Sequence, residues 1–465
     1  MSAQPALSRD AVIVIPGLMG TELIETEGDR MLWGLSDPRW YTSAWTTGSA
    51  LRRLALTPAE RNGQLGRIRP GRVLRAPAFA PVLRGIEPYA VLLTAVRRVV
   101  PDPAAVLEFG YDWRLPVGHN AEQLALAAEA HLANWRQHPQ GSAQAKLVLV
   151  AHSMGGLLAG YFTRVLGGDT AAEVRTTVTL GTPFYGAVKA AHILSIGQGA
   201  PLPLPRRRLR RLARTLPGLH DLLPAYRCVD EGDRARWLTP ADVAGLGGDA
   251  DLAEQSRQLY ERLRAAQPTE LRALVGVDQP TMQSVVLRDG VLHEQYYTCQ
   301  DGPDGQLQRV DRRGDSTVYR ESAAGDCGQP STLPQAHGAL AKTEEAVSFV
   351  SSVLTHRPQG PPLGGTHLGL DLPDVVTIGV PGQVTALSVQ TPTDVRGRIV
   401  DVASNLPVAP LRFGWRDGAV TAPLVLAAPG VYRVEAKAGA ASAVNQLVMA
   451  VAADQPDEDE PDDEY

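Results

Sequence analysis

Ser153 lies in a pentapeptide whose residue types suit nucleophilic catalysis. The G-x-S-x-G pattern is met by Ala151-His152-Ser153-Met154-Gly155, with alanine in the first small position. The pentapeptide follows the apolar run Leu147–Val150 and precedes a helical pattern over Leu157–Val165, so we expect a strand that turns sharply into a helix. Such a turn exposes the serine hydroxyl and directs the N–H of Met154 toward it, where negative charge would develop in a reaction.

A reactive serine requires a base and an acid further along the chain. The base is a histidine that takes the serine proton, and a carboxylate holds this histidine in the right tautomer. In hydrolases with this elbow the chain order is serine, acid, histidine. His337 directly precedes the last helical pattern of this region and is our candidate base, with His293 as the other histidine that fits the order. Asp315, in Gly314–Val318, is our candidate acid because a strand end is expected there. The remaining acidic residues nearby are typical of turns: Asp301, Asp304, Asp311 and Asp326.

A second donor for the oxyanion is expected in an early loop. Pro16-Gly17-Leu18-Met19-Gly20 follows the apolar run Ala11–Ile15. A glycine-rich loop after an early strand is where such hydrolases supply their second backbone donor, and we assign it to the N–H of Leu18. The alternative interpretation is an ordinary turn that ends a strand.

The elements that must position these residues alternate along the chain. Helical apolar spacing is present in Asn120–Arg136 and in Thr343–Leu354. Strands and helices in alternation predict a mostly parallel sheet with helices on both faces, an α/β fold. The expected strands are Ala11–Ile15, Ala105–Phe109, Leu147–Val150, Val174–Leu180 and Leu271–Val277.

Two segments interrupt this alternation. Residues 197–260 are interpreted as an inserted helical cap, in which Arg206–Arg214 holds six arginines that either contact anionic lipid headgroups or form a solvated helix face. Residues 31–51 are rich in tryptophan, and Trp40 and Trp45 are candidate lipid or lid contacts. The same aromatic residues could equally form the core of an excursion from the sheet.

The last part of the chain has a different periodicity. The hydrolase region is expected to span 1–358, a Pro- and Gly-rich linker 359–366, and a small immunoglobulin-like β-sandwich 367–453. Around seven short extended runs support the sandwich, and Tyr432 resembles the corner tyrosine of such domains. The sequence gives no partner for it. Residues 454–465 carry eight acidic and no basic side chains and are expected to form a disordered tail.

Composition restricts the function classes. The chain has 465 residues, 44% of them hydrophobic and 20% charged, with a net charge of −5 that gives no indication of nucleic-acid binding. The apolar runs are too short to span a bilayer, and the N-terminus lacks the pattern of a signal peptide. Three cysteines without metal-ligand spacing fit a reducing compartment. We therefore expect a cytoplasmic protein, peripheral to a membrane at most, without a cofactor or metal.

Several motifs together resemble the lecithin:cholesterol acyltransferase-like family of α/β-hydrolase lipases and phospholipases. They lie in the order of that family between about residues 10 and 355, and Asp315 and His337 fall where it keeps its acid and base. The resemblance implies attack by Ser153 on a fatty-acyl ester through an acyl-enzyme, with the N–H groups of Leu18 and Met154 as oxyanion donors. The motifs are Ile13–Leu23, Tyr111–Arg114, His152–Gly155, Leu180–Gly186, Gly314–Val318 and His337–Gly338.

The sequence also departs from that family. Its secreted members have a signal peptide and a disulfide over the lipid-binding excursion, and this chain shows neither, while the sandwich and the tail lie outside the match. The leading hypothesis is a serine lipase or phospholipase A, with acyl transfer to an alcohol as an extension. The alternatives are a serine thioesterase or amidase acting on a non-lipid acyl compound, and a non-catalytic binding or scaffold protein.

Overall fold

The computed structural model describes most of the chain. The described residues are 7–34, 49–74, 89–197, 206–303, 305–358, 368–373, 375–402, 404, 406–439 and 443–451. Trp40 and Trp45, the expected linker 359–366 and the acidic tail lie outside them. No helix in the described part is long and apolar enough to cross a membrane.

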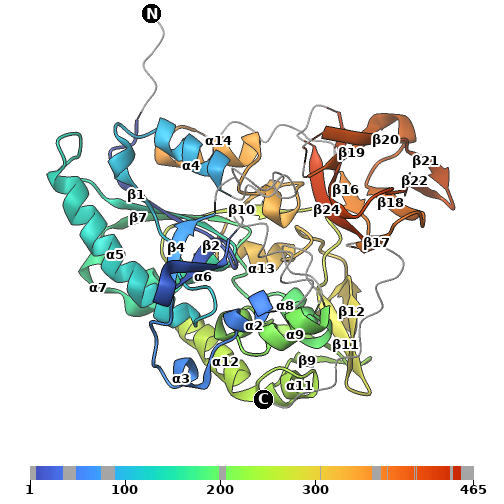
Figure 1. Ribbon diagram of the computed structural model, residues 1–465, viewed down its shortest axis with the longest axis horizontal. Helices are drawn as coiled ribbons and strands as arrows, with labels where there is room; N and C mark the ends of the chain where they lie inside the picture. Colours follow the sequence, from blue (N-terminus) through green and yellow to red (C-terminus); the bar gives the residue numbers. More distant parts are fainter. Residues whose placement is uncertain are drawn as a thin grey trace, which may run out of the picture.

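A six-stranded parallel sheet forms the centre of the molecule (Figure 1). The strand order is β15-β10-β7-β6-β1-β5, so the strand that leads to Ser153, β6, lies between β1 and β7. All six residues of β6 are buried, as expected for a parallel strand that is covered on both faces. The strands are β1 (Ala11–Ile15), β5 (Val106–Glu108), β6 (Leu147–His152), β7 (Val174–Leu180), β10 (Leu271–Gly276) and β15 (Ser331–Leu333).

Helices cover both faces of this sheet (Figure 1). α4 (Ala90–Arg98) and α14 (Glu344–Leu354) pack together on one side. α5 (Val117–Gln137), α6 (Met154–Gly160) and α7 (Gly168–Ala172) lie on the other, and α6 continues into a π-helical turn over Tyr161–Leu166. The strand order and the helix layers confirm the predicted α/β-hydrolase fold.

The excursion after β1 contains structure that the apolar pattern did not predict. Its described part forms a three-stranded antiparallel sheet in the order β3-β2-β4 and two short helices. Trp33 on β3 is buried and contacts Trp113 edge to face, so this aromatic residue belongs to the core. The elements are β2 (Thr21–Glu25), β3 (Arg30–Trp33), α2 (Ser49–Leu54), α3 (Pro58–Arg61) and β4 (Ile68–Val73).

The inserted segment 197–260 contains the expected helices and also two strands. β8 (Arg227–Asp230) and β9 (Ala235–Trp237) join a later hairpin in a four-stranded sheet of order β12-β11-β8-β9. The interpretation as a helical cap is therefore incomplete, because these strands are short, and β8 joins the sheet by pairing with β11, more than 50 residues away along the chain. The other elements between β7 and β15, apart from β10, are α8 (Val188–Ile196), α9 (Arg206–Ala213), α10 (Pro217–His220), α11 (Pro240–Gly245), α12 (Ala250–Ala265), β11 (Ser284–Arg288), β12 (Val291–Gln295), β13 (Thr298–Asp301), β14 (Leu307–Val310) and α13 (Arg320–Ala324).

The C-terminal part forms two sheets around a separate apolar core, and their pairs are antiparallel except for the parallel pair of β17 and β24. The order β16-β18-β22-β21 corresponds to the ABED sheet of an immunoglobulin-like sandwich, and in β17-β24-β23-β19-β20 the three middle strands correspond to GFC, with one further strand at each edge. Tyr432 donates a hydrogen bond from its hydroxyl to Ala428 O at 2.9 Å, which is the corner contact of such domains. The strands are β16 (Gly369–Asp371), β17 (Val375–Thr377), β18 (Gly382–Leu387), β19 (Val395–Asp401), β20 (Leu406–Leu411), β21 (Gly414–Arg416), β22 (Ala419–Leu424), β23 (Gly430–Ala438) and β24 (Val444–Val451).

One of the seven short extended runs of this region, Pro410–Trp415, is not a single strand. Its two ends belong to different sheets: Leu411 ends β20, and Gly414 begins β21. Two proline residues in β20 are tolerated because this strand lies at a sheet edge.

Candidate active site

Ser153 stands at the sharp turn between β6 and α6. Its backbone has φ 53° and ψ −128°. Residues other than glycine rarely adopt this conformation, which costs on the order of 1–3 kcal/mol. The small residue expected at Gly155 is required, since a Cβ there would lie 2.4 Å from Pro16 O. The strained serine is thus held by close packing of the elbow against the end of β1.

The structure brings the side chains of Ser153, Asp315 and His337 together. His337 Nε2 lies 2.8 Å from Ser153 Oγ, and His337 Nδ1 lies 2.7 Å from Asp315 Oδ2. A neutral imidazole in this arrangement donates its Nδ1 proton to the carboxylate and leaves Nε2 free to accept the serine proton. His293, the other histidine that the chain order allowed, lies on β12 and is exposed.

Asp315 is oriented by its own loop as well as by the histidine. The carboxylate is completely buried, and its Oδ1 accepts hydrogen bonds from Thr317 N at 3.0 Å and Val318 N at 2.7 Å. The backbone N–H of His337 donates to Asp315 O at 2.7 Å. The acid and the base are therefore linked through both their side chains and their backbones.

The loop between β1 and β2 passes directly over the serine. Gly20 N donates to Gly17 O at 3.0 Å, and Met19, but not Leu18, has a positive φ, 62°, which is the pattern of a type II turn. A Cβ on Gly17 would lie only 2.8 Å from Ser153 Cβ. No described residue accepts a hydrogen bond from the N–H of Leu18, and Met154 N is at the start of α6, where backbone donors lack intrahelical acceptors. Two backbone donors are thus near Ser153.

Four aromatic side chains hold this loop in place. Tyr111 donates from its hydroxyl to Pro16 O at 3.0 Å, and Trp113 Nε1 donates to Thr21 O at 3.1 Å. Trp33 Nε1 donates to Met19 O at 2.9 Å, and the Tyr89 hydroxyl accepts from Gly17 N at 2.7 Å. The sequence pointed to Tyr111–Arg114 only through the family resemblance, whereas Tyr89 carried no signal because it stands alone at the start of α4.

His152, the residue before the serine, connects this loop to the base. Burial and the neighbouring His337 lower the pKa of His152 to about 3, so its ring is neutral. Nε2 lies 3.2 Å from His337 O, which can only accept, so Nε2 carries the proton. Nδ1 therefore accepts from the Tyr89 hydroxyl, 2.8 Å away. Tyr89 and His152 link the loop Pro16–Gly20 to the backbone of His337.

A buried ion-pair cluster lies next to Tyr111 and Trp113 in the chain. Arg114 is buried, and its guanidinium pairs with Asp112 at 2.6 Å and with Glu60 of α3 at 3.0 Å. Arg114 Nη1 also donates to Leu54 O at 3.2 Å. The cluster connects the segment that carries Tyr111 and Trp113 to the excursion after β1.

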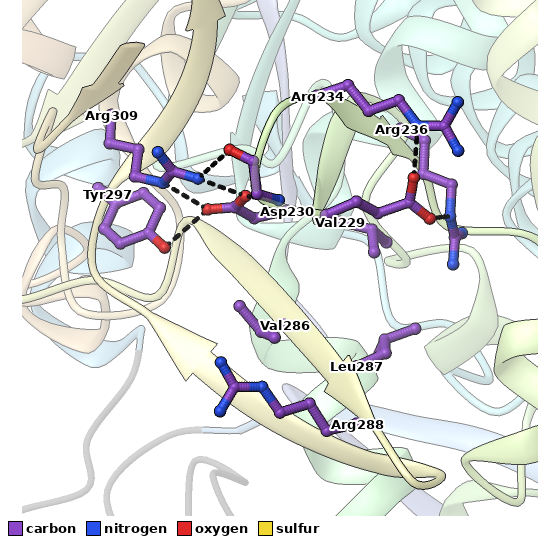
Figure 2. Close-up of a pocket in the computed structure, with 11 residues that line it drawn as sticks. Val229, Asp230, Arg234, Arg236, Val286, Leu287, Arg288, Tyr297 and Arg309 are labelled. Carbon is purple, nitrogen blue, oxygen red and sulfur yellow. Dashed lines mark hydrogen bonds and ion pairs between the residues drawn. The ribbon is translucent and has the colours of Figure 1, made fainter. Parts of the chain in front are cut away.

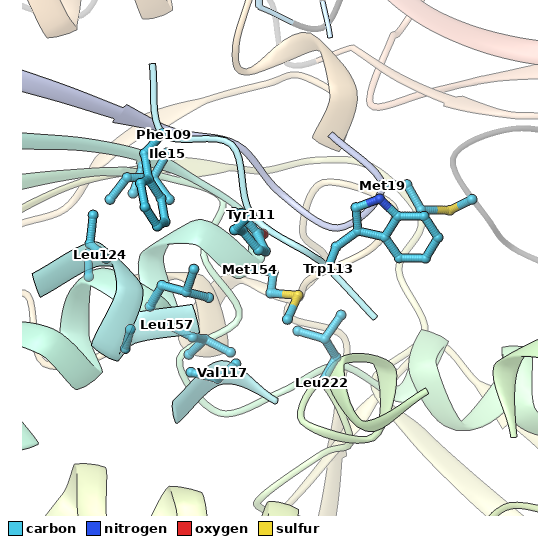
Figure 3. Packing of buried hydrophobic residues seen from close by; sticks show 14 of the residues in the cluster. Ile15, Met19, Phe109, Tyr111, Trp113, Val117, Leu124, Met154, Leu157 and Leu222 are labelled. Carbon is cyan, nitrogen blue, oxygen red and sulfur yellow. The ribbon is translucent and has the colours of Figure 1, made fainter. Parts of the chain in front are cut away.

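Apolar side chains surround the elbow. Figure 3 shows Met154 pointing from α6 toward Leu222 of the inserted segment, beside Trp113. The cluster extends along α6 to Leu157 and across to Val117 and Leu124 of α5. An apolar ligand bound beside Ser153 would therefore contact apolar side chains.

A separate cavity of about 580 Å³ lies in the β8–β9–β11 sheet (Figure 2). Most of its charged groups are paired with one another: Arg309 binds Asp230 at 2.7 Å, and Arg236 binds Glu231 at 2.6 Å. Its lining includes none of the three residues at the elbow site. In the described part of the chain no group of three or more His, Cys, Asp or Glu side chains could hold a metal ion.

Comparison with known proteins supports the resemblance. Residues 99–243 match the family model described as lecithin:cholesterol acyltransferase. This region is lecithin:cholesterol acyltransferase-like. The match includes Ser153 and Met154 but ends before Asp315 and His337, and it covers less than half of the chain. No curated protein matches the sequence.

Two solved structures illustrate a weak similarity to the chain. The crystal structure of the Tle4–Tli4 complex has a TM-score of 0.48 and 15% identity, and covers 74% of this chain and 96% of that one. Phospholipase PlaB from Legionella pneumophila has a TM-score of 0.29 and 10% identity, with 95% and 92% covered.

Proposed function

We propose that this lecithin:cholesterol acyltransferase-like chain is a serine hydrolase of the lipase or phospholipase A type, with Ser153, Asp315 and His337 as its catalytic triad. The observation that carries the proposal is the continuous hydrogen-bond chain from Ser153 Oγ through His337 to Asp315. The family match over residues 99–243 and the apolar surroundings of the elbow support a lipid acyl ester as substrate.

The geometry supports a two-step reaction. Ser153 Oγ attacks the ester carbonyl carbon while its proton moves to His337 Nε2. The N–H groups of Leu18 and Met154 stabilise the oxyanion of the tetrahedral intermediate, and Asp315 stabilises the imidazolium. His337 then returns the proton to the leaving alcohol, and an acyl-enzyme remains. Water attacks this acyl group by the same route and releases the fatty acid and the free serine.

The acceptor of the acyl group follows from what shares the pocket with the ester. An alcohol bound beside the acyl-enzyme would take the place of water and make the protein an acyltransferase. Trp40, Trp45 and the arginines of Arg206–Arg214 are the candidate lipid contacts, and the two tryptophans lie outside the described residues.

Ser153→Ala tests the proposal directly. Loss of a triad member typically lowers the rate by a factor on the order of 10⁴–10⁶. The wild type should hydrolyse medium-chain acyl esters and phospholipid vesicles and should react covalently with a fluorophosphonate probe, whereas Ser153→Ala should do neither while keeping its circular dichroism spectrum. Retained activity in the variant would make the assignment wrong. Cleavage of soluble thioesters without cleavage or binding of vesicles would favour a thioesterase or amidase instead, and a wild type that does not react with the probe would favour a binding protein.

A further inference from the structure

The C-terminal sandwich contacts the two loops that carry the acid and the base. The first contact is made by Gln279, which follows β10 and is completely buried. Its backbone pairs with the acid loop: Gln279 N donates to Gly314 O at 2.9 Å, and Gly314 N donates back to Gln279 O at 3.3 Å. Gly314 directly precedes Asp315.

The side chain of the same residue pairs with the sandwich. Gln279 Nε2 donates to Leu368 O at 3.0 Å, and Gln279 Oε1 accepts from Leu370 N at 3.1 Å. The carboxamide thus satisfies the free edge of β16 as the peptide group of a neighbouring strand would. Gly369, between these two residues, allows the close approach, because a Cβ there would lie 2.2 Å from Asp278 O.

A second contact reaches the loop of the base. Gln335 is 1% exposed and lies two residues before His337. Its Nε2 donates to Ala443 O at 2.9 Å, next to the start of β24. Inside the sandwich, Gln446 Nε2 of β24 donates to Leu370 O at 2.8 Å. The two attachment points, on β16 and beside β24, are therefore held at a fixed separation.

We propose that the sandwich is a positioning element of the active site: it sets the distance between the Asp315 and His337 loops through Gln279 and Gln335. This inference rests on the proposed function. The two glutamines are positioning residues, because they touch neither the substrate nor the reacting atoms. A buried amide destabilises the fold wherever its polar atoms are unpaired, so an apolar side chain would serve better if the contact only filled space. A hydrogen-bonded amide, in contrast, fixes the geometry of the groups that it joins.

The test uses the full-length chain and three substitutions of glutamine by methionine, which keeps the side-chain length and removes the amide. Gln279→Met removes the hydrogen bonds to Leu368 O and Leu370 N of the sandwich, together with a 3.4 Å bond to Val277 O. Gln335→Met removes one and is the milder change, because no described residue pairs with its Oε1. Gln383→Met, on the exposed side of β18, is the matched control. Thermal unfolding is measured for each, together with the rate of fluorophosphonate labelling at Ser153 from pH 5 to 9 and kcat and KM for a soluble acyl ester.

We expect Gln279→Met and Gln335→Met to lower the labelling rate and kcat of the folded protein about 10- to 100-fold, because a displacement of about 1 Å can cost this much. The apparent pKa of the labelling profile should shift and KM should stay unchanged. Gln383→Met should behave as the wild type. Wild-type labelling rates and pH profiles in both variants, with only a lower unfolding temperature, would overturn the inference and leave the sandwich a stabilising attachment.

Failure of the proposed function gives a different result. In that case the wild type itself is not labelled. The inference is then decided by the low-field proton resonance of His337 Nδ1–H, which the short contact to Asp315 should produce. Its loss or displacement in Gln335→Met supports the positioning role, and an unchanged resonance in both variants refutes it.

Discussion

The Tyr89 hydroxyl lies 2.8 Å from His152 Nδ1 and accepts the N–H of Gly17 at 2.7 Å, so one phenol joins the loop over the serine to the residue before it. Burial raises the pKa of Tyr89, which therefore remains a donor to His152 over the whole working range. These contacts fix the loop that supplies the N–H of Leu18.

Tyr89→Phe should therefore slow acylation more than it destabilises the protein. The change removes two hydrogen bonds and leaves Gly17 N and His152 Nδ1 without their partner. We expect kcat to fall by about tenfold or more, because a net hydrogen bond contributes about 1 kcal/mol. Tyr260→Phe removes a comparable buried hydroxyl, which donates to Asp221 O at 2.8 Å, and should lower the unfolding temperature without a change in kcat. Equal kinetic effects in the two variants would refute the assignment.

Leu18→Pro should remove one oxyanion donor without disturbing the backbone. Leu18 occupies the second position of a type II turn, where proline fits, and proline has no N–H. We expect kcat to fall by about 10²–10³, the usual loss for one such donor. Met19→Gly is the control, because it relieves the positive φ of Met19 and keeps both donors. A proline variant with wild-type kcat would show that the second donor lies elsewhere.

Arg114→Met should destabilise the fold strongly. It leaves the buried carboxylate of Asp112 without its cation and takes one of two arginines from Glu60, which keeps its pair with Arg67. Breaking a buried ion pair costs about 3–5 kcal/mol. Urea denaturation measures the loss. Arg257→Met breaks an exposed pair with Glu254 on α12 and should leave the free energy of unfolding unchanged. A stable Arg114→Met variant would mean that the cluster carries little of the stability of the excursion.

The buried carboxyl group of Asp221 should make the free energy of unfolding depend on pH. Burial raises its pKa from 3.8 to about 7, although its Oδ2 accepts from Val117 N at 2.7 Å. The folded state therefore binds the carboxyl proton of Asp221 more tightly than the unfolded state. The protonated carboxyl contributes to the free energy of unfolding below pH 4, and this contribution is lost as pH rises to about 7. The full loss is about 4 kcal/mol. Asp221→Asn, which can still accept from Val117 N, should gain unfolding temperature relative to the wild type between pH 5 and 8; a constant difference would contradict the raised pKa.

Local patterns predicted the parts of the fold that are determined locally. Ala11–Ile15 and Leu147–Val150 are continuous apolar runs, and buried parallel strands are recognisable by such runs. The elbow, Asp315 and His337 were found because the chain order and the strand ends restrict the choice, and the structure brings these three side chains into contact.

The remaining features depend on partners far apart in the chain. β8 and β9 are short and pair with each other, and β8 also pairs with a hairpin that follows β10, so periodicity gives no signal for them. Tyr89 and Gln279 act through bonds to residues 72 and about 90 positions away, which no local pattern reports. The division of Pro410–Trp415 between two sheets also depends on tertiary pairing.

Asp315 and His337 are joined by two hydrogen bonds, one between their backbones and one between their side chains. The elbow is linked to this pair by two separate contacts, from the Ser153 hydroxyl to His337 Nε2 and from His152 Nε2 to His337 O, and Ser153 itself has a strained backbone. Gentle heating or low concentrations of urea should therefore separate Ser153 from the imidazole while the imidazole keeps its carboxylate, and inactivation should precede the loss of secondary structure.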